Sequence, residues 1–323
     1  MSSILDQAIL VGKEGTYGTP ATLSRAFEAQ ADTWQRTQEA LESVGMRAGQ
    51  QTLRSDRRRQ INMGAEGSIE MDALSSGLGL LLEGVFGSTT GPTQIGATAA
   101  YTSTFATTTD ASNISYTIQK LVATNSGVLN PFTYHGAVIT DFELSQDVGG
   151  FLTVKFDFDS EDEDKSTAAG TPTYPSTGSP FDWTQVALTV AGTPICATSF
   201  NFSANMGLKT DRRFLCNSGL KSQPKRAAMP EYTGEINAEF EDTTQYDKFV
   251  AGEIFEVTAT WTGAAIDTEN EVISLTLPAC QYDGSTPEAS IDDMTMQSLP
   301  FKVLFNGTDA AATLAYTSVD TAL

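Results

Sequence analysis

Two stretches of the chain decide its fold, Gly67-Ser-Ile-Glu-Met-Asp-Ala and Gly234-Glu-Ile-Asn-Ala-Glu-Phe. In both, apolar and polar residues alternate, which is the period of a β-strand with one buried face. Each stretch then runs into a segment whose apolar residues have helical spacing. The chain therefore contains the same strand-to-helix step twice.

The surroundings of the two stretches also correspond. A strongly basic segment lies upstream of each. Downstream, Ile139-Thr-Asp-Phe-Glu-Leu-Ser-Gln precedes the alternating strand Phe151-Leu-Thr-Val-Lys-Phe-Asp-Phe, and Ile291-Asp-Asp-Met-Thr-Met-Gln-Ser precedes Phe301-Lys-Val-Leu-Phe. Elements that recur in one order indicate tandem copies of a unit. Each copy would hold roughly 150 residues, which is the size of one domain.

We therefore predict a mainly β protein with two tandem β-sandwich or β-barrel domains, each with one flanking helix. The opening Val11-Gly-Lys-Glu-Gly-Thr-Tyr-Gly-Thr-Pro is rich in turn-forming residues, and the tract before Pro180 is rich in Pro, Gly, Ser and Thr. The predicted division is an irregular N-terminal arm over 1–20, a first domain over 21–165, a linker over 166–180 and a second domain over 181–323.

Local patterns place the remaining elements. One apolar stripe predicts a helix that ends at Gly87, and Asp242 can cap a second helix. Two hairpins are expected over 137–159 and 291–305, and a polar tail over 306–323. The stripe of the first helix consists of Leu74, Leu78, Leu81, Leu82 and Val85, and that of the second of Tyr246, Phe249 and Val250.

The net charge of −21 argues against a protein that grips DNA, since such a grip needs many lysines and arginines. No apolar run approaches the roughly 18 residues of a membrane span, and the N-terminus lacks the pattern of a secretory signal. Three cysteines, Cys196, Cys216 and Cys280, have no metal-binding spacing. We expect free buried thiols, with a Cys196–Cys216 disulfide as the alternative.

The sequence offers little for catalysis. His135 is the single histidine, and the GxSxG, GxxxxGK[ST] and GxGxxG motifs are absent. The acidic run from Asp157 lacks the glycine of an EF-hand loop, so a solvated strand end is favoured over weak cation binding. Acidic pairs such as Asp292-Asp293 are common in any acidic β protein. We expect no enzyme, no metal and no cofactor.

The basic residues are unevenly distributed, since eleven of the 19 lie in two short segments. Three interpretations are open: solvated loops, nucleic-acid contacts that conflict with the net charge, or docking onto an acidic face of a neighbouring subunit. The third is favoured, because segregated opposite charges set register and orientation between subunits. The residues are Arg47, Arg54, Arg57, Arg58, Arg59, Lys209, Arg212, Arg213, Lys221, Lys225 and Arg226.

The order of these motifs resembles the tail tube (major tail) proteins of long-tailed bacteriophages. The resemblance rests on Val11-Gly-Lys-Glu-Gly-Thr-Tyr-Gly-Thr-Pro, on Arg57-Arg-Arg, on Gly67-Ser-Ile-Glu-Met-Asp and on Leu78-Gly-Leu-Leu-Leu, and it runs over nearly the whole chain. It implies rings whose inner strands close into a barrel, stacked into a tube through which DNA passes. The long loop of that family reaches the adjacent ring, so the eleven basic residues are expected to make inter-ring contacts.

The resemblance also implies partners and location. We expect self-association, contacts with the tape measure, terminator and distal tail proteins, and residence in the virion after synthesis in the cytoplasm of the host bacterium. Because simple members carry one unit and form sixfold rings, a duplicated chain is expected to form trimeric, pseudo-sixfold rings. An acidic lumen would repel the phosphates of passing DNA. The alternatives are a tail terminator or baseplate ring component and a carbohydrate-binding β-sandwich module.

Overall fold

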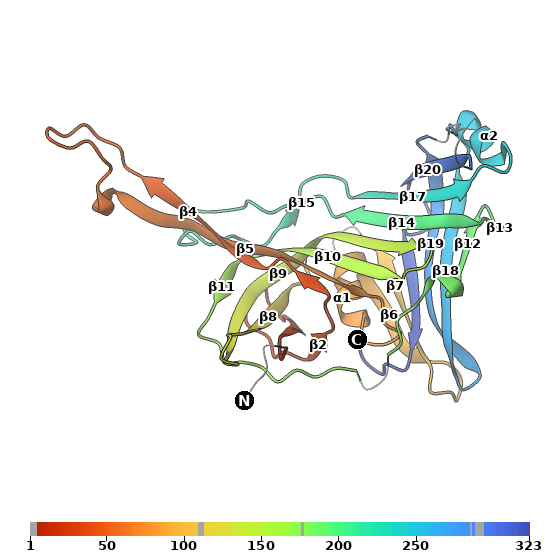
Figure 1. The fold of residues 1–323 in the computed structure, drawn as a ribbon, viewed down its shortest axis with the longest axis horizontal. Coiled ribbons are helices and arrows are strands. Elements are labelled where there is room, and N and C mark those ends of the chain that lie inside the picture. Colours follow the sequence, from red (N-terminus) through yellow and green to blue (C-terminus); the bar gives the residue numbers. More distant parts are fainter. Residues whose placement is uncertain (1–4, 109–112, 176–177, 285, 288–293) are drawn as a thin grey trace.

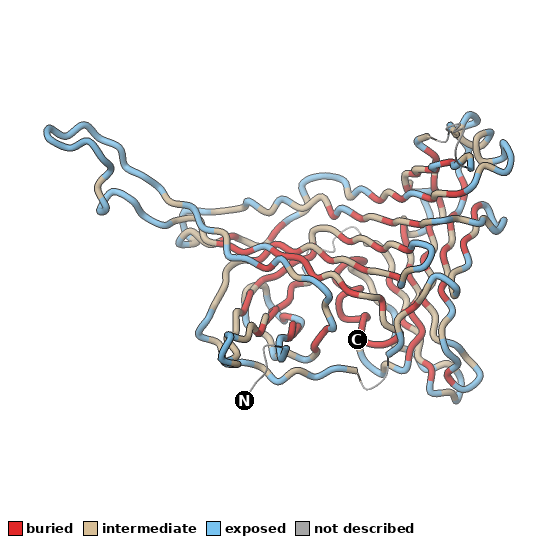
Figure 2. The backbone as a smooth tube through the Cα atoms, in the orientation of Figure 1, coloured by how far each residue is buried: buried red, intermediate tan, exposed pale blue. Residues whose placement is uncertain are grey.

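The computed structural model describes residues 5–108, 113–175, 178–284, 286–287 and 294–323. The molecule is mainly β, with two α-helices among the described residues. A hairpin arm projects from one end of the body, and the second helix lies at the opposite end (Figure 1). Buried residues run through the body, whereas the arm is exposed along most of its length (Figure 2).

The strands of the first half are β1 (Ala8–Lys13), β2 (Arg25–Phe27), β3 (Ala31–Asp32), β4 (Gln35–Glu42), β5 (Arg58–Asp72), β6 (Gly87–Gln94), β7 (Tyr101–Thr107), β8 (Tyr116–Ala123), β9 (Leu129–Asp147), β10 (Thr153–Ser160) and β11 (Asp162–Asp164). Helix α1 spans Gly79–Phe86. Strand β10, for example, alternates half-exposed and buried residues over most of its length, and the high strand content confirms the predicted mainly β class.

The strands of the second half are β12 (Val186–Val190), β13 (Thr193–Pro194), β14 (Ala197–Asn205), β15 (Leu208–Lys209), β16 (Lys225–Arg226), β17 (Glu231–Glu239), β18 (Phe255–Ile266), β19 (Glu269–Tyr282), β20 (Met296–Val303) and β21 (Thr313–Ser318). Helix α2 spans Thr244–Ala251, and the carboxylate of Asp242 accepts the backbone N–H of Thr244 at 2.8 Å. The predicted helix is therefore present. Its N-cap residue is Thr243 rather than Asp242, which lies one position earlier.

Strand pairing follows one order in both halves. In the first half it runs β2–β1–β8–β9–β10–β5–β4, and in the second β13–β12–β18–β19–β20–β17–β14. Gly67 lies opposite Phe158, and Gly234 lies opposite Phe301 at the same place in the order. A Cβ on either glycine would come within 2.4 Å of an aromatic ring. The two halves therefore share one order of strand pairing, and the domain boundaries themselves stay a prediction.

Among the described residues, two pairs of strands join the halves. The carboxyl half of β9 pairs with β14, from Asp141 opposite Asn205 to Asp147 opposite Ser199. Strand β21 pairs with β7 of the first half. One hydrophobic core accordingly includes residues of both halves, among them Phe142 and Phe202, whose rings lie 6.4 Å apart in an edge-on arrangement.

Two segments predicted to be irregular contain strands. Ala8–Lys13 lies inside the predicted N-terminal arm, but it is buried and pairs with both β2 and β8. The predicted polar tail contains β21, whose Leu314 and Tyr316 are buried against β19 and β7. Both segments are short, and they pair with strands that are distant in the sequence. Local composition therefore does not predict them as strands.

Two further expectations need correction. Leu74 lies outside the first helix and Leu78 is its N-cap residue, because Gly77 adopts a φ of 95° and α1 begins only at Gly79. The helix does end at Gly87, which is left-handed as predicted. Of the expected closing hairpin, 291–293 lie outside the described residues. Met296–Val303 forms one strand along β17 rather than two arms.

Candidate assembly surfaces

A continuous sheet, β4–β5–β10–β9–β14–β17–β20, extends through both halves and has two unlike faces. One face packs into the core through residues such as Ile69, Phe156 and Ile236. The other face, called here the polar face, carries short polar and charged side chains that are mostly half-exposed or exposed. The apolar and polar residues lie on opposite faces because they alternate along each strand.

Cross-strand contacts order the polar face. One row of directly opposed residues crosses six strands: Glu70, Lys155, Glu143, Ser203, Thr233 and Lys302. Beside it, the amide of Asn201 donates to Glu143 at 2.6 Å and the hydroxyl of Ser298 donates to Glu235 at 2.7 Å. Such pairs stabilise the sheet and hold the carboxylates on one surface.

Acidic groups outnumber basic ones on the polar face. Its two lysines, Lys155 and Lys302, bind Asp157 at 3.1 Å and Glu231 at 2.5 Å respectively. The polar face is therefore a surface of negative potential. Its exposed and half-exposed acidic residues are Glu66, Glu70, Asp72, Asp141, Glu143, Asp147, Asp157, Glu231, Glu235 and Glu239.

The first basic segment lies at the end of the hairpin arm formed by β4 and β5 (Figure 1). Arg54 donates to Asp56 within the arm, and Arg58 lies 3.2 Å from Glu42 on the opposite strand. The guanidinium hydrogen bonds of Arg54 hold the pKa of the Asp56 carboxyl below its usual value. The five predicted arginines, Arg47, Arg54, Arg57, Arg58 and Arg59, thus share one projecting element.

The second basic segment behaves differently, since its long side chains bind within the chain. Arg213 donates to the carbonyl oxygens of Met63 and Gly219 at 2.6 Å, and Arg226 donates to that of Thr108 at 3.2 Å. The remaining contacts in this segment are Arg212 to the Gln223 carbonyl at 2.5 Å, Lys225 to Asn113 at 3.2 Å, and Lys209 to Asp211 at 3.8 Å.

Lys221 makes the most buried of these contacts. Its ammonium binds the carboxylate of Asp159, and the two side chains are 10% and 7% exposed. The stem of Lys221 lies over Gly64, where a Cβ would come within 2.6 Å of it. Burial raises the pKa of the Asp159 carboxyl to about 6, and the hydrogen bond from Lys221 offsets part of that rise. This ion pair therefore holds the second segment on the first half.

Replacing Lys221 with methionine is expected to lower the free energy of unfolding by about 3 kcal/mol at pH 7, because the variant leaves a buried carboxylate without its cation. The raised pKa of Asp159 means that protonation favours the folded state as the pH falls through 6. The loss should therefore be smaller at pH 5 than at pH 7. Urea unfolding at both pH values measures it. The control is Lys209→Met, whose side chain is 57% exposed. Equal midpoints for the two variants would refute the assignment.

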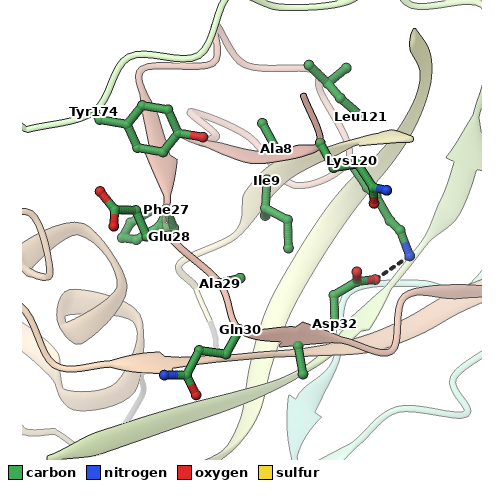
Figure 3. A pocket seen from close by; sticks show the side chains of 12 residues that line it. Ala8, Ile9, Phe27, Glu28, Ala29, Gln30, Asp32, Lys120, Leu121 and Tyr174 are labelled. Atoms are coloured by element: carbon green, nitrogen blue, oxygen red, sulfur yellow. Dashed lines mark hydrogen bonds and ion pairs between the residues drawn. The ribbon is translucent and has the colours of Figure 1, made fainter. Parts of the chain in front are cut away.

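Figure 3 shows a pocket with a volume of about 210 Å³. It lies between β1, β3 and β8, and Lys120 in its wall binds Asp32. The charges of these two residues compensate each other, and Glu28 adds a further carboxylate to the lining.

The single histidine was the first residue weighed for catalysis. His135 is half-buried, with Nε2 4.0 Å from Asp164. Hydrogen bonds from Ser166 and Thr167 hold the pKa of the Asp164 carboxyl at about 2. Among the described residues, no group of three or more His, Cys, Asp and Glu is arranged to bind a metal. Asp292-Asp293 lies outside them.

The cysteines partly follow expectation. All three are free, and Cys280 is buried, so the alternative Cys196–Cys216 disulfide is not formed. The prediction of buried thiols is wrong for Cys196 and Cys216, which are exposed. In the described part of the chain, neither helix has the length and apolar content needed to cross a membrane.

A continuous antiparallel sheet with a polar face and a projecting basic arm are the main features of this mainly β protein. The chain belongs to the phage tail tube protein family, whose model matches residues 5–303, and this confirms the resemblance noted in the sequence. No curated protein matches the chain. As a family member, it is a structural component of the virion tail.

Proposed function

We propose that three copies of this chain form a ring of six β units, that rings stack into a tail tube, and that the polar face lines the channel through which DNA passes. The observation that carries this proposal is the single sheet that continues from the first half into the second through β9 and β14. Two units joined edge to edge form one third of a closed sixfold wall.

The equal pairing order supports closure of the ring. Strand β4 holds the place in the first half that β14 holds in the second. β14 pairs onward with β9, whereas β4 pairs only with β5 among the described residues. An edge strand of this kind can extend a neighbouring sheet, and a closed ring would leave no such edge exposed. Repetition of the β9–β14 joint between chains would close the wall after three copies.

The charge of the polar face supports its place on the inside. A channel must let DNA pass without binding it, and a surface with ten exposed or half-exposed acidic residues and two neutralised lysines repels phosphate. The opposite face is buried in the core and offers no such surface. The mechanism is that of a preformed polar conduit, with no catalytic turnover.

The other contacts of the tail follow the same proposal. The arginines of the arm bind other copies of the chain, whereas the second basic segment holds its own two halves together. Tape measure, terminator and distal tail proteins are the further partners, and DNA is a passenger rather than a ligand. Synthesis in the cytoplasm of the host precedes assembly.

The second candidate is a tail terminator or baseplate component. Such a protein would form a similar ring, but its rings would not stack into a tube. A carbohydrate-binding module is less well supported. Trp34 and Trp261 are buried, so of the three tryptophans only Trp183 is substantially exposed for stacking on a sugar.

The mass of the assembled species tests the ring. Three chains of 34.4 kDa give a smallest closed species of about 103 kDa, with larger species at multiples of that mass. Analytical ultracentrifugation of the purified chain measures this series. A hexameric smallest ring would contradict the trimer, and a series that ends at one ring would favour the terminator.

A further inference from the structure

The two basic segments are counterparts of one another. The tip of the arm and the loop between β15 and β16, residues 43–57 and 210–224, both contain fifteen residues. Gly67 and Gly234 hold the same place in their sheets, and they are 167 positions apart. At the same spacing, Leu53-Arg54-Ser55 corresponds to Leu220-Lys221-Ser222. Arg54 is thus the counterpart of Lys221.

The loop 210–224 shows what such a segment binds. It lies on the first half of its own chain, where Lys221 covers Gly64 and binds Asp159. The backbone N–H of Met63 donates to the carbonyl oxygen of Gly219 at 3.0 Å. The loop therefore covers the end of the neighbouring unit's sheet, beside the polar face.

Within the part of its own chain that the structure describes, the arm tip binds no such surface. The hydrogen bonds of 43–57 to other described residues run within the hairpin. Val44 and Met46 are 86% and 107% exposed. The tip and the start of β5 together carry five arginines and one acidic residue, Asp56, in a chain of net charge −21. A basic and apolar element of this kind needs a partner of opposite charge with apolar surface beside it.

The second half provides a surface of that chemistry at the corresponding place. The position that matches Gly64 is Glu231, whose side chain is 57% exposed. Its neighbour Met229 is 92% exposed, and Phe305, which follows β20, is 70% exposed. In the first half, the carboxylate that binds Lys221 is that of Asp159 on β10. In the second half, the carboxylate at this place is that of Glu231 on β17. The position that matches Asp159 is Lys302, which now binds Glu231.

We infer that residues 43–57 of one copy bind the second half of another copy over Glu231, with Arg54 pairing with that carboxylate. This contact between two chains would be equivalent to the contact that loop 210–224 makes with the first half of its own chain. The arm would then reach sideways to the next chain of a ring. This inference rests on the proposed self-assembly, and it specifies which surfaces meet.

A charge exchange tests the pairing. Arg54→Glu and Glu231→Arg alone should each raise the concentration needed for assembly at least about tenfold, because like charges then face each other. The double variant Arg54→Glu/Glu231→Arg should return to within about threefold of the parent. Sedimentation velocity measures assembly, and melting temperatures check the fold. If the parent assembles and both single variants assemble equally well, the pairing is wrong while the tube remains.

A cysteine pair tests the direction of the contact. In a Cys196→Ser/Cys216→Ser background, assembled Met46→Cys/Met229→Cys protein should form covalent species that end at three chains, because a sideways contact closes within one ring. A ladder beyond three chains would place the arm between rings and overturn the inference. Assembled particles without any disulfide would overturn it as well. Both results would leave the proposed tube intact, whereas failure of the ring mass test would not.

Discussion

Tubes assembled from chains carrying Glu70→Lys, Glu143→Lys and Glu235→Lys are expected to retain double-stranded DNA that parental tubes release. These three carboxylates lie on β5, β9 and β17 of the polar face. Each lysine displaces counterions from DNA, so retention should fall by roughly 10³-fold or more between 50 and 200 mM salt. Filter binding of labelled DNA at a series of salt concentrations measures the effect.

The control for this prediction changes the net charge by the same amount elsewhere. Glu241, Glu253 and Asp309 are exposed and lie outside the polar face, so their replacement by lysine should produce a much smaller gain in DNA retention. Melting temperatures of both variants establish that the sheet is intact. Equal retention by the two variants would show that a different surface lines the channel.

Chains with Arg57→Glu, Arg58→Glu and Arg59→Glu are expected to remain monomeric and folded. The three arginines lie at the base of the arm tip, on an element with few contacts to the body of the molecule (Figure 2). Charge reversal should therefore leave the core unchanged but place negative charge against an acidic partner, at a cost of several kcal/mol. The concentration needed for assembly should rise more than about 100-fold.

Sedimentation velocity and thermal melting together test this second prediction. The control replaces the same three arginines with lysine, which keeps the charge and should preserve assembly to within about tenfold. Tubes of normal length from the glutamate variant would show that the arm has no role in contacts between copies. A large drop in melting temperature would instead assign these residues to the stability of the chain.

Local pattern was sufficient for much of the fold. Alternation located β5 and β17, and spacing located α1 and α2 to within a few residues. It was insufficient for β1 and β21, because their burial depends on β8 and β19, which are distant in sequence. Strand β9 is a related case, since one continuous strand pairs with β8 at its start and with β14 at its end.

The candidate surfaces show the same limit. The sequence located both basic segments but treated them as equivalent. The structure separates them, because Asp159 and Gly64 give Lys221 a partner inside the chain and Arg54 bonds only within the arm. The sequence did not predict the polar face for a similar reason. Alternation defines two faces of each strand, and only the packing of Phe156 and Ile236 into the core decides which face is left for solvent.

Electron microscopy of the purified, assembled protein, with rotational averaging of end-on views, tests the central claim most directly. We predict hollow tubes whose rings contain six similar lobes with threefold modulation, since each chain contributes two related but unequal units. At higher resolution, the wall of the channel should contain β5, β9 and β17 with their carboxylates facing inward. Solid particles, or rings whose polar face points outward, would contradict the account.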